Sequence, residues 1–145
     1  MLVAKLNFIL LFTAQAQSTT VLSSYLDIND ALVKTNPKNA SVAAGEMVSI
    51  QRGKTDDLSK KILVDAKGIS ESSDVKMQRK HFDLLSQNVY EYGKKSGEKE
   101  GTIYKQYCPM AFNNTGAFWL ASEKEITTPY FGSMMLHCGS VKEEF

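Results

Sequence analysis

The chain of 145 residues has a formal net charge of +1, with 43% hydrophobic and 23% charged residues. This balance is typical of a globular protein and excludes an extensively disordered chain. Lysines alternate with glutamates and aspartates, as in the segment 94–101, so the sequence provides no basic face for nucleic acid.

Residues 1–16 have the features of a secretory signal peptide. Lys5 precedes an apolar run from Leu6 to Phe12, and Ala14 and Ala16 form an A-x-A-like cleavage site. The apolar run is far shorter than the roughly 20 residues that a membrane span needs. The sequence predicts cleavage after Ala16, export, and no membrane span in the mature chain. An N-terminal anchor or a buried first helix is the alternative.

Residues 17–145 are predicted to form a single domain of the mainly helical (α+β) class. From Ser18 to about Gly97, apolar residues recur at steps of three and four, which is the pattern of one helix face. Turn sequences at 35–39, 52–57 and 70–74 divide this region into about four helices, and their short connections favour an up-and-down bundle. The predicted core positions are Leu22, Tyr25, Leu26, Leu32, Val33, Val42, Met47, Ile50, Leu58, Ile62, Leu63, Ala66, Val75, Gln78, Phe82, Leu85, Val89 and Tyr92.

Residues 101–145 have a different character and are predicted to form a small β-hairpin or loop module on the bundle. The segments 102–108 and 117–122 are rich in aromatic and β-favouring residues, and Asn-Asn-Thr-Gly at 113–116 is turn chemistry. We expect Trp119 to be buried where this module packs on the helices. Residues 133–140 then return the chain toward the first strand. Because this module holds both cysteines and three methionines, we expect the function to reside here.

The two cysteines allow two interpretations. Cys108 and Met110 would point to one face of an extended segment, and Met134, Met135, His137 and Cys138 crowd the other end of the module. Thiolate, thioether and imidazole groups suit a soft metal such as Cu(I). The alternative is a Cys108–Cys138 disulfide, which an exported protein with two cysteines usually forms. Either chemistry requires the two cysteines to be neighbours in space.

Catalytic interpretations have weaker support. His81 lies on a predicted helix, and the adjacent pair His137–Cys138 is a poor nucleophile–base arrangement. Glu123 and Glu125 are explained by a solvated turn, and the glycines are isolated turn residues. We therefore expect that the chain is not an enzyme.

The C-terminal third, "YKQYCPMAFNNTGAFWLASEKEITTPYFGSMMLHCG" (104–139), resembles the signature of an exported bacterial family of unknown function. Its members combine a helical region with a CPMAF…GAxWLS…NPYFG…MLxCG ending. The same domain occurs at the C-terminus of HlyD/CusB-like periplasmic adaptors of heavy-metal efflux systems. The segments "YLDINDALVKTN" (25–36) and "QRKHFDLLSQNVYEYGKKSG" (78–97) are similar to the first and last helices of that family.

The resemblance implies a periplasmic protein that binds copper or a similar soft metal. Its motif positions are occupied here by Cys108, Met110, Met135 and Cys138. Relatives carry histidine where this chain has Tyr107, which leaves His137 as the additional ligand. Without adaptor domains, the chain is expected to act as a free protein with an efflux adaptor or a metallochaperone as its partner.

The alternative function is a disulfide-stapled helical protein–protein interaction module without a metal. Its expected partner surface consists of Phe118, Trp119, Tyr130 and Phe131. Exposure of these four side chains would favour this alternative, whereas their burial, with the sulfur atoms at a surface cleft, would favour the metal site.

Overall fold

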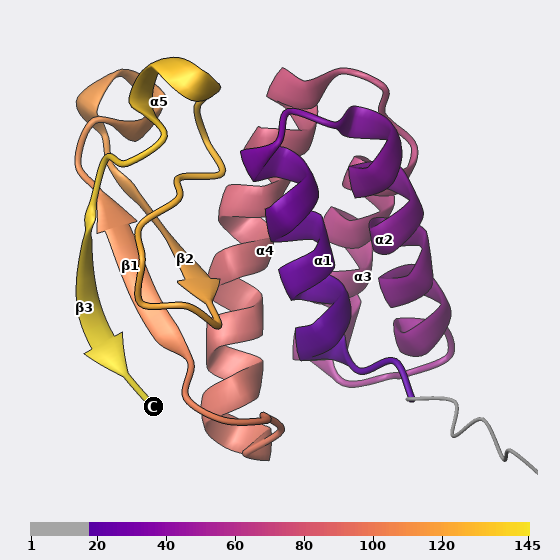
Figure 1. Cartoon of the computed structure of the whole chain (residues 1–145). Helices are drawn as coiled ribbons and strands as arrows, with labels where there is room; N and C mark the ends of the chain where they lie inside the picture. The colour runs from indigo at the N-terminus through magenta and orange to yellow at the C-terminus, as the bar shows by residue number, and fades with distance from the viewer. Residues whose placement is uncertain (1–17) are drawn as a thin grey trace, which may run out of the picture.

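The computed structural model describes residues 18–145, which form a four-helix bundle and a small antiparallel sheet (Figure 1). The predicted signal peptide at 1–16 lies outside the described residues. The bundle contains α1 (Val21–Val33), α2 (Pro37–Gln51), α3 (Asp57–Ser70) and α4 (Val75–Ser96), and each helix packs against the next one in the chain. The predicted mainly helical α+β class is therefore confirmed.

The helix ends follow local sequence signals. Thr20 caps α1 with its side chain, and Asn36 caps α2 immediately before Pro37, whose fixed φ suits the first turn of a helix. Asp56 caps α3 through its carboxylate. Gly97 ends α4 in the left-handed conformation at φ 65°, which glycine adopts without a Cβ clash.

The helices bury one face each, but the buried face of α2 differs from the prediction. Val42, which the sequence places in the core, is 60% exposed. Met47 is buried as predicted, and Ala40, Ala43 and Ala44 are buried in place of Val42. Because small side chains allow neighbouring helices to approach closely, the alanine face of α2 packs against α1 and α3.

The sheet has the strand order β2-β1-β3, with β1 (Tyr104–Cys108), β2 (Ala117–Ala121) and β3 (Ser140–Glu144). The predicted hairpin is the β1–β2 pair, in which Gln106 lies opposite Trp119. β3 pairs with the other edge of β1, after a return of the chain that the sequence indicated without predicting a third strand. Figure 1 shows the sheet on one side of the bundle, where β2 contacts α4 and α1.

The hairpin connection contains an unusual backbone. The four-residue turn α5 (Ala111–Asn114) includes Phe112, Asn113 and Asn114 at φ values of 51°, 54° and 64°. Consecutive left-handed non-glycine residues are energetically unfavourable, so the surrounding fold must hold them. The amide of Gly116 donates to the carbonyl of Ala111 at 2.9 Å and closes the turn.

The segment between β2 and β3 crosses the sheet and contains the 3₁₀ turn η1 (Ser133–Met135). The buried Gln106 amide anchors its beginning by donating to the carbonyl of Glu123 at 2.9 Å. None of the helices in residues 18–145 combines the length and apolar character of a membrane span.

Candidate functional site

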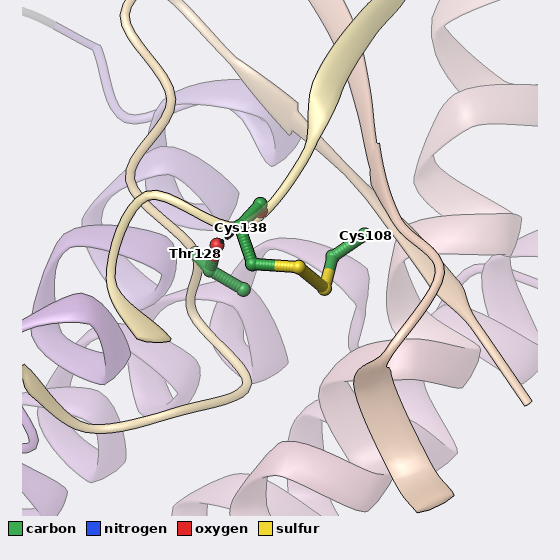
Figure 2. The surroundings of a disulfide bond; sticks show 3 residues. All are labelled: Cys108, Thr128 and Cys138. Carbon is green, nitrogen blue, oxygen red and sulfur yellow. Dashed lines mark hydrogen bonds between the residues drawn. A yellow bond between two sulfur atoms is a disulfide. The ribbon is translucent and has the colours of Figure 1, made fainter. Parts of the chain in front are cut away.

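A disulfide joins Cys108, at the end of β1, to Cys138, just before β3 (Figure 2). The Cα atoms are 5.5 Å apart, which confirms the prediction that these cysteines are neighbours. Cys108 is fully buried and Cys138 is half-buried. The Thr128 hydroxyl donates to the Cys138 carbonyl at 2.6 Å, and this contact ties the crossing segment to the bridge.

The other predicted metal ligands are close to the two cysteines in the sequence, but their side chains differ in exposure to solvent. Met110 is 48% exposed, Met135 is half-buried, and His137 is exposed with its Nδ1 2.8 Å from the carbonyl oxygen of Ile126. Across residues 18–145, no group of three or more His, Cys, Asp or Glu side chains is arranged to hold a metal ion. Cys108 and Cys138 could act as thiolate ligands only after reduction of their bond.

Two of the four residues that were expected to form the partner surface are buried. Trp119 is 0% exposed and Tyr130 is 7% exposed, and their rings contact edge to face with centroids 6.0 Å apart. The Trp119 ring lies against Tyr130 and Gly139 of the crossing segment, and Tyr130 also packs against Phe82 of α4, so burial of apolar area holds both rings inside. Phe118 and Phe131 are half-buried and Cys108 is fully buried, so the structure meets neither the exposure of all four rings expected for a partner surface nor the surface cleft of sulfur atoms expected for a metal site. The expected burial of Trp119 is confirmed.

A buried tyrosine–serine–tyrosine network joins the sheet to the bundle. The Tyr25 hydroxyl lies 2.6 Å from the Ser86 hydroxyl and accepts from the Leu120 amide at 3.0 Å. The Tyr130 hydroxyl donates to the Phe118 carbonyl at 2.7 Å. These contacts satisfy polar groups on the edge of β2 that is not paired with β1, and so cover that edge of the sheet.

Burial controls the ionisation of this network. Removal from water raises the pKa of Tyr25 far above its usual range, although hydrogen bonds from Ser86 and Leu120 oppose the shift. Burial likewise raises the pKa of Tyr130 well above 10. Both phenols are therefore protonated at neutral pH and act as hydrogen-bonding groups of the interface rather than as bases.

Arg79 is a second link between bundle and module. Its guanidinium donates to the carbonyls of Leu32, Pro129 and Phe131 and to the Thr35 hydroxyl, at 2.8–3.1 Å. Burial lowers the pKa of this side chain. Arg79 therefore clamps the end of α1 to the segment that leads to η1.

His81, which the sequence places on a helix, lies partly exposed beside Asp65. The Nδ1 atom of His81 is 3.6 Å from the Asp65 carboxylate, which also accepts from the Asn88 amide at 3.3 Å. Burial raises the pKa of Asp65, and the neighbouring His81 and Asn88 side chains partly oppose this shift. This pair lies on α3 and α4, on the bundle rather than in the C-terminal module.

Sequence reasoning did not find Arg79, Tyr25 or Ser86 as linking residues. One signal was available, because Arg79 falls on the apolar stripe of α4, four residues after Val75 and three before Phe82. A charged residue in that stripe must find partners inside the fold. Their identity depends on chain segments far away in the sequence.

The bundle matches the family described as "Protein of unknown function (DUF3347)" over residues 21–101. The chain belongs to the DUF3347 family. The matched residues comprise the four helices and end before β1, so the disulfide lies in the part of the chain that follows the match. Comparison with curated proteins and with solved structures gave no match.

Proposed function

We propose that this DUF3347 protein is an exported, non-catalytic protein–protein interaction module stapled by a disulfide. The observation that carries the proposal is the Cys108–Cys138 bond, which fixes the return of the chain from η1 to β3. Disulfides persist in oxidising compartments such as the periplasm. This requirement agrees with the predicted signal peptide and with the resemblance to periplasmic proteins.

The bundle supplies a rigid support for the module. The Tyr25–Ser86 network and the Arg79 clamp join the two parts through buried hydrogen bonds, and Trp119 is buried beside them. A surface held on such a scaffold binds with little loss of conformational freedom. A binding role therefore suits a module in which the bridge closes the loop from Cys108 to Cys138.

The test is photo-crosslinking of the full chain in the cells that produce it. A photoreactive amino acid is placed at an exposed position of the module, such as Asn113, and in a parallel variant at exposed Val64 on α3. We expect a discrete crosslinked partner from the module and none from α3. No specific partner from any module position would contradict the proposal.

Soft-metal binding is the second candidate, and it remains a proposal. It is favoured by the 5.5 Å approach of Cys108 and Cys138, with Met110 and Met135 within three residues of them. In this function a dithiol reductant, itself oxidised to a disulfide, first converts the Cys108–Cys138 bond to two thiols, which lose their protons when Cu(I) binds, and the protein passes the metal to an efflux adaptor or metallochaperone. His137 is the expected additional ligand.

The two functions predict different thiol counts. Protein purified anaerobically from the periplasm is denatured, alkylated and analysed for free thiols and for bound copper in the same sample. An oxidised, copper-free protein supports the interaction module. Two free thiols together with bound copper, lost in Cys108→Ser and in Cys138→Ser and weakened in Met110→Leu, would support the metal function instead.

A further inference from the structure

We propose that the partner docks on one end of the C-terminal module and presents an apolar segment without charged side chains. This end, the module tip, consists of Pro109, Met110, Asn113, Asn114 and Met134. The inference rests on the interaction function proposed above and names its surface. It replaces the aromatic surface expected from the sequence, since Trp119 and Tyr130 are buried.

The module tip is built from two distant chain segments that the fold brings together. Figure 1 shows α5 and the gold turn at residues 133–135 at the same end of the module. The disulfide joins the segment that leads into α5 to the segment that follows η1. The rings of Phe112 and Tyr130 also lie 5.2 Å apart beneath this end, so both segments share one support.

The two segments carry almost no charge. Residues 106–122 contain no Asp, Glu, Lys or Arg, and residues 126–141 contain none either, although 23% of the whole chain is charged. The centres of protein interfaces are depleted in charge and enriched in methionine and aromatic residues. A partner lysine or carboxylate buried here would find no opposite charge within these segments, which is costly. The complementary partner segment is therefore apolar and uncharged.

Two methionine side chains at the module tip are exposed to solvent. Met134 is 96% exposed and Met110 is 48% exposed. Methionine side chains are flexible and polarizable, and they adapt to the shape of an apolar partner. Asn113 and Asn114, both in the left-handed conformation, are exposed as well and add two uncharged hydrogen-bonding side chains. Such strained turns are found where a fold holds a binding surface in a fixed geometry.

The free edge of β3 is a poorer candidate for docking. An irregularity in the β1–β3 register interrupts the ladder near Lys105, and β3 presents the exposed Lys142 and Glu144. Bulges and charges are devices that disfavour addition of another strand. The neutral module tip has neither feature.

The first experiment selects random 12-residue peptides displayed on phage against the full mature, oxidised chain. We expect a consensus of apolar residues with no Lys, Arg, Asp or Glu. A charged consensus, or no enrichment above background, overturns the inference.

The second experiment measures the affinity of one selected peptide by fluorescence anisotropy. The double variant Met110→Ser/Met134→Ser should weaken binding at least about tenfold, as expected when central contacts of an interface are lost. Met77→Ser is the matched control, because Met77 on α4 is 43% exposed and lies outside the module. Binding should change little between low and high salt, since no ion pair is formed. Equal losses in both variants, or a steep salt dependence, overturn the inference.

Two further outcomes separate this inference from the function on which it rests. If the double variant retains the crosslinked cellular partner, the interaction function stands and the module tip is the wrong surface. If sedimentation shows a dimer that Met134→Ser dissociates, the occupant is a second copy of the chain, and the proposed partner chemistry is overturned.

Discussion

Removal of the disulfide should lower the free energy of unfolding by about 3.5 kcal/mol. The bonded cysteines are 30 residues apart in the sequence. In the chain-entropy model, opening a loop of this length returns roughly 12 cal/mol/K of conformational entropy to the unfolded state, or about 3.5 kcal/mol at 25 °C. We choose the double variant Cys108→Ala/Cys138→Ala because Cys108 is fully buried, and a serine hydroxyl there would add an unpaired polar group.

The assay is urea denaturation of the oxidised wild type and the double variant, followed by tryptophan fluorescence and circular dichroism. The wild type reduced with a phosphine is the control, because it lacks the bridge but retains both sulfur atoms. We expect the reduced protein and the double variant to agree to within about 1 kcal/mol, the remainder being the loss of sulfur packing. Hydrogen exchange should accelerate mainly in residues 127–144, which the bridge ties to β1.

A loss below about 1 kcal/mol would refute this reasoning, since it would show that the unfolded chain without the bridge is already restricted. An equal acceleration of exchange in α1–α4 would also contradict it, because the bridge would then support the whole bundle rather than the module.

Three other perturbations test the module–bundle interface. Trp119→Ala should cost roughly 3–5 kcal/mol, and the native protein should show the blue-shifted emission of a buried indole, because Trp119 is 0% exposed; emission like that of free tryptophan in water would contradict this. The raised pKa of Tyr25 means that, above the unfolded pKa of about 10, the unfolded chain loses a proton that the folded chain keeps, so stability should fall as the pH rises; urea denaturation between pH 9 and 11, in roughly half-unit steps around that unfolded pKa, should show a smaller fall for Tyr25→Phe. Hydrogen bonds from Lys94 and Tyr90 lower the pKa of Glu143, so its contribution is present above the unfolded pKa of 4.5 and is lost as the pH falls through the lower folded value; Glu143→Gln should flatten the acid side of the stability profile, and an unchanged profile would exclude this role.

The sequence by itself determined the local structure of the bundle. Helix caps such as Asp56 and the terminator Gly97 act on backbone groups within a few residues, so their effect can be recognised from neighbouring positions. The apolar stripe of α4 and the hairpin turn at 113–116 likewise depend on residues that are close together in the sequence. The exposure of Val42 was not predictable in this way, because α2 offers two plausible faces and only packing against α1 and α3 selects the alanine face.

The tertiary structure decided what the C-terminal residues do. The sequence spacing of Cys108 and Cys138 is compatible both with two reduced thiols and with a disulfide. The 5.5 Å distance between their Cα atoms depends on the pairing of β3 with β1. The aromatic run around Trp119 has the composition of either a core or a partner surface. Contacts with Tyr130 and Gly139 of the crossing segment bury Trp119, whereas Met134 of the same segment is exposed. Sequence patterns indicate which residues can be buried, but long-range contacts determine which of them are buried.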